Sequence, residues 1–178
     1  MTVYLPEAEY ASLQVRTDTG DITLGELPVF REVTLRSDTG DISCTGISGD
    51  LLDCMTSTGD VSVQNSAPNI LQMQSDTGDF AVRVVACDEI HMKTNTGDVD
   101  AENVNVRMLT CTTGTGDIQL HGIQAQEYLQ AFADTGDITI RNSDAPEINI
   151  ETDTGDVIVP AAWEFQRIET DTGKIKYE

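Results

Sequence analysis

Short runs of alternating apolar and polar residues lie on both sides of a repeated Thr-Gly dipeptide, and this pattern recurs along the whole chain. Counted from each glycine, apolar residues stand at offsets −7 and −5 before it, at +2 and +4 after it, and apolar or small residues at +7. Alternation with a period of two is the signature of β-strands. Because the apolar parity changes across the glycine, each repeat predicts two strands joined by a bend.

The repeats have an almost constant length. Their glycines are separated by 20, 19, 19, 19, 19, 20, 19 and 18 residues: Gly20, Gly40, Gly59, Gly78, Gly97, Gly116, Gly136, Gly155 and Gly173. A unit this short cannot bury an apolar face alone and leaves no room for a crossover helix, so neighbouring units must stack. We therefore predict an all-β, single-stranded parallel β-solenoid (a β-helix) of about nine coils of 18–20 residues. Residues 1–178 are expected to form one domain.

An antiparallel sandwich is the alternative fold, since it also contains short strands at regular intervals. It does not explain why every repeat carries the same bend at the same offset. The bend itself has a consistent chemistry. Glycine suits a positive φ, and offset −2 exchanges Asp, Asn, Ser and Gly, which are turn residues. Offset −1 is always Thr, and offset −3 is Ser or Thr except at Ala133. Parity predicts that both hydroxyl rows point inward.

Offset +1 holds an aspartate in eight repeats and a lysine in the last: Asp21, Asp41, Asp60, Asp79, Asp98, Asp117, Asp137, Asp156 and Lys174. Carboxylates about 4.8 Å apart repel by about 1 kcal/mol per pair at the dielectric of water. We expect each carboxylate to accept a backbone N–H at the bend, which offsets that repulsion. A ladder of Ca²⁺ sites is the alternative. Since the glycine-rich nonapeptide of calcium-binding β-rolls is absent, no metal-ligating residue is predicted.

Motifs that resemble catalytic or binding signatures are better explained by the repeat. Asp-Thr-Gly resembles the aspartic-protease signature but occurs six times at regular spacing. A glycosidase carboxylate pair needs a cleft, and no coil has an insertion long enough to build one. His91 and His121 stand at unrelated offsets. Thr-x-Thr pairs such as Thr17 and Thr19 resemble ice-binding ladders, but parity predicts inward threonines. We predict no catalytic residue, no cofactor and no enzymatic activity.

The formal net charge of −21 excludes nucleic acid as a partner, because phosphate binding needs a basic surface. It also disfavours docking on anionic lipid. No apolar run is long enough to span a bilayer. Val3 and Leu5 stand where +2 and +4 of an earlier repeat would fall, so the chain is interpreted as a possible fragment of a longer, anchored protein.

Two small groups of residues call for comment. Cys44, Cys54 and Cys111 occupy inward offsets and are expected to be small buried hydrophobes, while Cys87 lies in the return segment. The spacing of cysteines and histidines matches no zinc site. Near the C-terminal end, Trp163 and Phe165 are expected to cap the core.

The segment VYLPEAEYASLQVRTDTGDI at residues 3–22 resembles the adhesin-like family of bacterial β-strand repeat proteins, and the later Thr-Gly-Asp-Ile/Val repeats extend the resemblance along the chain. The resemblance implies a bacterial solenoid of the cell envelope or extracytoplasmic surface, often attached to an anchoring segment, with no catalytic residues. The leading hypothesis is a non-enzymatic structural or adhesin-like module that binds an unknown protein or glycan without inserting into the membrane. Bactofilins, which are similar in coil length and polymerise end to end, lack the regular Thr-Gly-Asp; such a self-associating scaffold is one alternative, and a cation-binding solenoid is the other.

Overall fold

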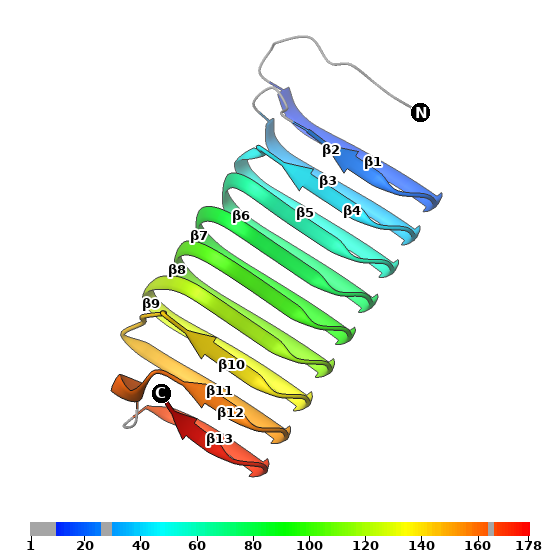
Figure 1. Ribbon diagram of the computed structural model, residues 1–178. Helices are drawn as coiled ribbons and strands as arrows, with labels where there is room; N and C mark the ends of the chain where they lie inside the picture. Colours follow the sequence, from blue (N-terminus) through cyan, green and yellow to red (C-terminus); the bar gives the residue numbers. More distant parts are fainter. Residues whose placement is uncertain (1–9, 26–29, 164–165) are drawn as a thin grey trace.

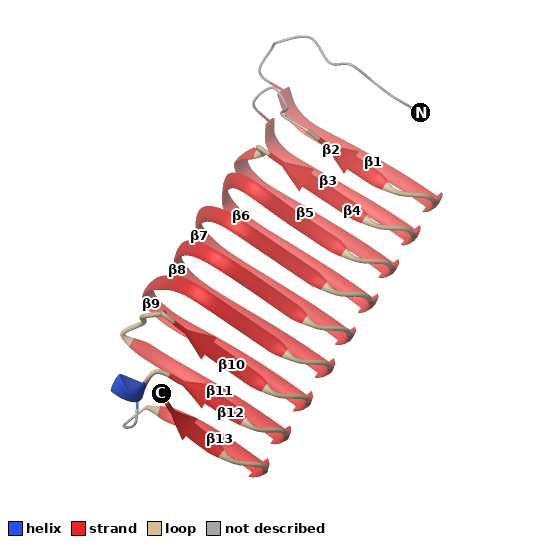
Figure 2. Ribbon diagram, viewed as in Figure 1, coloured by secondary structure: helices blue, strands red, loops and turns tan. Residues whose placement is uncertain are grey.

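The computed structural model describes residues 10–25, 30–163 and 166–178. In these residues the chain winds as stacked coils, each with a sharp bend at one end and a rounded return at the other (Figure 1). Nearly every segment is a strand, and one 3-10 turn is present near the C-terminal end (Figure 2). The predicted parallel β-solenoid of about nine coils is confirmed. Val3, Leu5, Leu27 and Phe165 lie outside the described residues, so their predicted placements are not tested.

All strands belong to one parallel sheet that follows the coils. The elements are β1 (Tyr10–Thr19), β2 (Ile22–Leu24), β3 (Phe30–Thr39), β4 (Ile42–Thr45), β5 (Ser48–Thr58), β6 (Val61–Thr77), β7 (Phe80–Thr96), β8 (Val99–Thr115), β9 (Ile118–Thr135), β10 (Ile138–Arg141), β11 (Glu147–Thr154), β12 (Val157–Val159), η1 (Ala161–Trp163), β13 (Arg167–Thr172) and β14 (Ile175–Tyr177). In the middle of the rod, β6 to β9 each run from one bend to the next without interruption.

The register between coils keeps each offset in a column. Val61 pairs with Phe80, which pairs with Val99, and the same one-repeat step applies along the long strands. The register shifts between β8 and β9 at Val106/Met108. This β-bulge absorbs the extra residue of the twenty-residue repeat, because a bulge places two residues of one strand opposite one of its neighbour.

The core is a set of apolar columns along the rod axis. Residues at −7, −5, +2 and +4 are buried through the middle coils, for example Leu71, Met73, Val61 and Val63, all 0–2% exposed. Offset +7 is buried in the central repeats and is filled by Val85, among others. The core cluster continues from Ile22 to Ile168. The predicted aliphatic columns are therefore confirmed.

The apolar columns are less completely buried in the first and last described coils. Leu13, Val15, Leu24 and Ile175 are only partly buried, and Tyr177 is 40% exposed. At the C-terminal end Gln166 and Ala162, assigned to −7 and +7, are also exposed. The reason is that described coils pack on these residues from one side only. Trp163 is 4% exposed and joins the core cluster, as expected of a capping residue.

Candidate functional site: the bend edge and the long-strand face

The nine Thr-Gly bends, eight followed by Asp and the last by Lys174, lie above one another and form a straight edge of the rod, here called the bend edge (Figure 1). Their glycines from Gly20 to Gly155 have φ between 118° and 156°, a region that is open to glycine at little cost. The coils also approach closely at this point. A Cβ built on Gly97 would lie 2.1 Å from the carbonyl oxygen of Gly78. Glycine is therefore required both by the dihedral angle and by the neighbouring coil.

Hydrogen bonds connect each bend to the next. The N–H of Gly78 donates to the carbonyl oxygen of Thr96 at 2.9 Å, and the N–H of Asp98 donates to Oδ1 of Asp79 at 2.8 Å. The aspartate bond recurs at every step from Asp21 to the N–H of Lys174, with N···O distances of 2.7–3.0 Å. The prediction that each carboxylate accepts a backbone N–H is confirmed, and the donor belongs to the following coil.

The hydroxyl at −3 makes a second coil-to-coil contact. Thr94 Oγ1 donates to the carbonyl oxygen of Gly78 at 3.1 Å, and Thr113 Oγ1 donates to that of Gly97 at 2.9 Å. The same contact is made by Ser37, Thr56, Ser75, Thr152 and Thr170. Offset −3 is buried from Ser37 to Thr152, as parity predicted, and partly buried at Thr170. Ala133 is the exception at this offset and has no hydroxyl to donate.

The prediction that the −1 threonines point inward is wrong. All nine are exposed: Thr19, Thr39, Thr58, Thr77, Thr96, Thr115, Thr135, Thr154 and Thr172. The strand alternation already ends at −2, so offsets −2 and −1 both face solvent on the bend. In each Thr-x-Thr pair only the second threonine is exposed in this way. The first contacts the preceding coil, except for Thr17, which donates to the carbonyl oxygen of Thr19. The exposed threonines thus form a single column and not the flat double ladder of an ice-binding face.

The carboxylates of the bend edge are committed to the fold. One oxygen of each +1 aspartate from Asp21 to Asp156 accepts the N–H of the next coil. Among residues 10–25, 30–163 and 166–178, no cluster of three or more His, Cys, Asp or Glu side chains is arranged to hold a metal ion. The column of aspartates therefore acts as a set of backbone-binding groups that hold successive bends in register.

The outer surface of the long strands has a different composition. We call the outward residues of β5 to β9 at offsets −8, −6 and −4 the long-strand face: Leu51, Asp53, Met55, Ile70, Gln72, Gln74, Glu89, His91, Lys93, Met108, Thr110, Thr112, Tyr128, Gln130 and Phe132. Its charged members are two acids and one base. In a chain of net charge −21 this surface is close to neutral, and it combines amides and hydroxyls with large apolar side chains.

A shallow groove of about 410 Å³ runs across this face between neighbouring columns. Its uncharged polar lining includes Gln72, Gln74, His91 and Thr110. Its charged lining is Arg36, Asp53 and Lys93, of which Arg36 and Asp53 pair with each other. The uncharged groups supply both hydrogen-bond donors and acceptors. The groove therefore fits a partner that offers hydroxyl, amide or apolar groups and little charge.

Ion pairs brace the margins of the long-strand face. Arg36 Nη2 lies 2.7 Å from Asp53 Oδ2. Arg107 contacts Glu89 at 2.5 Å and Glu127 at 2.9 Å, which joins three successive coils. These guanidinium groups are partly exposed, so solvent screening keeps the contribution of each pair to stability small. They fix the lateral position of the coils more than they add to stability.

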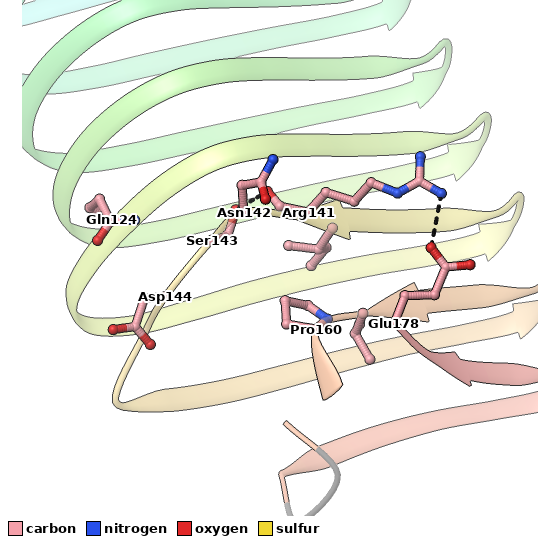
Figure 3. Close-up of a pocket in the computed structure, with 9 residues that line it drawn as sticks. Gln124, Arg141, Asn142, Ser143, Asp144, Pro160 and Glu178 are labelled. Carbon is pink, nitrogen blue, oxygen red and sulfur yellow. Dashed lines mark hydrogen bonds and ion pairs between the residues drawn. The ribbon is translucent and has the colours of Figure 1, made fainter. Parts of the chain in front are cut away.

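A second hollow of about 370 Å³ lies where β10 ends and the strand pattern is interrupted. Figure 3 shows Arg141 at its margin, paired with Glu178 at 3.3 Å, with Asn142, Ser143 and Asp144 along the turn. Ser143 Oγ accepts the N–H of Ile123 and donates to the carbonyl oxygen of Arg141. The turn residues are thus used in local hydrogen bonds, and the cation of the hollow is neutralised by its carboxylate partner.

Each of the two histidines contacts a carboxylate or an amide side chain. His91 Nε2 lies 3.4 Å from Glu89 Oε2, and Asn142 Nδ2 donates to His121 Nε2 at 2.7 Å. Burial raises the pKa of Cys87 to about 12 and that of Cys111 to about 12 as well. These thiols are protonated at neutral pH, so they are not activated nucleophiles.

In the described part of the chain no helix has the length and apolar character needed to cross a bilayer. The fold and its edge define a class: a structural repeat module in which side chains bind one coil to the next. Sequence comparison gives the family. A profile described as Toastrack DUF4097 matches residues 1–103 and, in an overlapping second match, residues 83–176, so the chain belongs to the Toastrack DUF4097 family. Searches of curated proteins and of solved structures gave no match.

Sequence reasoning missed two features of this surface. The long-strand face was not identified, although strict alternation along the long strands would have marked −8, −6 and −4 as outward columns. The second corner of the coils that begin at Gly40 to Gly136 was missed as well. It lies at offset +6, where Gly46, Asn65, Asn103, Gly122 and Asn142 have φ between 49° and 71°. The signal was the recurrence of Gly and Asn at one offset, which is typical of left-handed backbone.

Proposed function

We propose that this protein is a non-enzymatic structural module of the bacterial cell envelope, with an adhesin-like role in which the long-strand face binds a neutral glycan. The observation that carries the proposal is the contrast between the two surfaces. The +1 carboxylates of the bend edge hold the coils together, as in the bond from the Asp98 N–H to Asp79. Most side chains of the long-strand face make no coil-to-coil bond of this kind; the exceptions are Asp53, Met55 and Glu89, which contact Arg36 or Arg107 of a neighbouring coil.

The composition of the face supports a neutral ligand. Sugar hydroxyl groups both donate and accept hydrogen bonds, as do the amides of Gln72, Gln74 and Gln130. Tyr128 and Phe132, both half-buried, offer aromatic surface beside these amides. Aromatic side chains supply contact area at a small entropic cost. A polyanionic ligand is disfavoured by the overall charge of −21, since like charges repel across the interface.

Binding to a panel of immobilised neutral and acidic glycans tests the ligand. We expect the chain to bind a subset of neutral glycans, and the double variant Gln72→Glu/Thr110→Glu to lose at least about tenfold in affinity, because buried carboxylates at the contact are costly. The matched control is Gln119→Glu/Thr139→Glu, which adds the same charge to outward positions of β9 and β10. Equal loss in both variants, or no binding to any glycan, would contradict the proposal. If the chain binds a protein instead, the long-strand face would remain the proposed contact surface, and the glycan would be replaced by a protein partner.

Location is tested separately in the bacterium that carries the gene. Fractionation and protease treatment of intact cells should find the chain in the envelope and cleave it from outside. A signal confined to the cytosol would remove the envelope role. Neither result depends on the identity of the glycan.

End-to-end polymerisation and cation binding remain the competing functions. Light scattering over a range of concentrations tests the first, and size that rises with concentration would favour it. One observation argues against a polymer in which the aspartate column simply continues from one copy to the next. Lys174 has no carboxylate that could accept the N–H of a following coil. A thermal melt with and without Ca²⁺ tests the second, because a ligand that binds only the folded state raises Tm.

A further inference from the structure

Two thiols face each other inside the rod, between the coils of Gly40 and Gly59. Cys44 lies on β4 at offset +4, and Cys54 lies on β5 at offset −5. Their Sγ atoms are 4.0 Å apart, and the residues are 1% and 0% exposed. The two strands belong to opposite walls of the core, on either side of the bend.

The surroundings of this pair are apolar. In the sheet register Cys44 lies between Leu24 and Val63, and Cys54 lies between Leu35 and Met73. The hydrogen bond made by each thiol is to the other thiol. A cysteine in a core is commonly a small hydrophobe, but two facing cysteines at contact distance have a chemistry that a Val or Ala pair would not have.

We propose that Cys44 and Cys54 are a site of covalent modification, oxidised to a disulfide that ties the two walls of the solenoid together. A disulfide needs an S–S distance of about 2.05 Å. Starting from 4.0 Å, each sulfur has to move by about 1 Å, through rotation about χ1 and a small approach of the strands. The crosslink would close the segment between residues 44 and 54.

The reaction needs a disulfide-bearing oxidant, such as oxidised glutathione or a thiol-disulfide oxidase. One cysteine, as its thiolate, attacks the oxidant and releases one thiol from it, which leaves a mixed disulfide. The second cysteine, as its thiolate, attacks the mixed disulfide and releases the other thiol. In total, two S–H bonds are lost, one S–S bond forms in the protein, and the oxidant leaves reduced by two electrons with two protons.

Burial determines when this can happen. The hydrogen bond with Cys44, followed by burial, raises the pKa of the Cys54 thiol well above its usual range. Both residues are also closed to solvent in the folded rod. Exchange requires an accessible thiolate. The crosslink therefore forms before the coils of Gly40 and Gly59 have folded. Once they have folded, burial protects the pair in the state it then has, either two thiols or a disulfide.

Cys111 is a natural control for this argument. It occupies the same offset as Cys54, three coils further along, and is also 0% exposed. The residue at +4 of the coil before it is Ala101, where Cys54 has Cys44, and its thiol donates to the carbonyl oxygen of Gln130 at 3.5 Å. Cys111 is thus a thiol of equal burial without a facing thiol.

The test is refolding of the full chain from denaturant in oxidised glutathione, with a parallel sample in reduced glutathione. Intact mass after alkylation counts the remaining thiols, and peptide mapping identifies the linked pair. We expect the oxidised sample to lose two of its four thiols, with Cys44 and Cys54 in one linked peptide pair. Its Tm should rise by about 5–10 °C and fall back after unfolding and refolding with reductant.

A Cys87→Ala/Cys111→Ala variant should behave in the same way, because it keeps the facing pair. Four free thiols after oxidative refolding of the wild type would overturn the proposal, as would a link that involves Cys87 or Cys111. An oxidised form with unchanged or lower Tm would also overturn it, since a crosslink that strains the walls is not a native state. None of these outcomes depends on the glycan or on the location proposed above.

Discussion

The coils that begin at Gly40 to Gly136 each turn twice through backbone with positive φ, and the two corners differ sharply in what they tolerate. At the bend edge every repeat uses glycine, with φ of 118–156° where a positive value is recorded. At the second corner, offset +6, Gly46, Asn65, Val84, Asn103 and Gly122 all occur, with φ of 49–71°. The second range is the left-handed helical region, which Asn enters at modest cost. A positive φ alone does not demand glycine.

The neighbouring coil explains the difference. A Cβ on any bend glycine from Gly40 to Gly155 would lie 1.9–2.5 Å from the carbonyl oxygen of the preceding bend glycine. At the second corner, a Cβ on Gly122 would meet the Asn103 side chain at 3.0 Å, and that side chain can move. The invariance of the bend therefore comes from contact between coils, and the freedom of the second corner comes from its exposure.

The largest expected effect is a substitution at the bend. Gly97→Ala would place a Cβ 2.1 Å from the carbonyl oxygen of Gly78 in a dihedral region closed to alanine. We expect a loss of at least about 4 kcal/mol in the free energy of unfolding, or failure to fold. The matched control is Asn103→Ala at the second corner, with an expected loss of about 1 kcal/mol. Urea denaturation of both variants measures the difference, and equal losses would contradict the role assigned to the neighbouring coil.

Next comes the carboxylate that binds the following coil. Asp79→Ala removes the acceptor of the Asp98 N–H, and we expect a loss of about 1–2 kcal/mol because hydrogen bonds to charged groups are worth more than neutral ones. Asp79→Asn retains an Oδ1 acceptor and should lose less than half as much. The two midpoints in urea give the comparison. Equal effects of the two variants would show that the charge, and not the acceptor, matters at this position.

A gain in stability is expected at the second corner. Val84 is β-branched, has φ of 54° and is 55% exposed, a combination that costs about 1–2 kcal/mol. Val84→Asn should therefore raise the free energy of unfolding by about 1 kcal/mol, since Asn65 and Asn103 occupy the same corner in the adjacent coils. Ala86→Asn, an exposed position nearby, should have little effect. A destabilised Val84→Asn would mean that the valine side chain makes a favourable contact.

The smallest effect is expected at Ala133, the gap in the row of −3 hydroxyls. Ala133→Ser supplies a donor for the carbonyl oxygen of Gly116 and should stabilise by about 0.5–1 kcal/mol. The reverse change in the adjacent coil, Thr113→Ala, removes the 2.9 Å bond to Gly97 and should destabilise by about 1 kcal/mol or somewhat more. Thermal melts of both variants test the pair. A serine that destabilises would indicate that this coil has no room for the hydroxyl.

The repeats made the fold predictable from the sequence. The orientation of single side chains was harder to predict. Stacked parallel coils follow from the fixed interval between glycines, and the inward columns follow from alternation. The −1 threonines were misassigned because alternation was extended into the bend, where the backbone stops behaving as a strand. The donor for each +1 aspartate is about nineteen residues away, as in the bond from Asp98 to Asp79, so pairing between coils had to be known first. The facing of Cys44 and Cys54 likewise depends on how the two walls are staggered.

The bulge at Val106/Met108 has a consequence for how such rods can change in length. It takes up a surplus residue on the rounded side, while the column of bend glycines continues past it without a step. Added or lost residues are thus accommodated in the rounded return of the coil, and the bend glycines keep a constant spacing along the rod. Whole coils could be duplicated or deleted in evolution, or single returns lengthened. The residues of the bend edge would still lie at regular intervals along the rod.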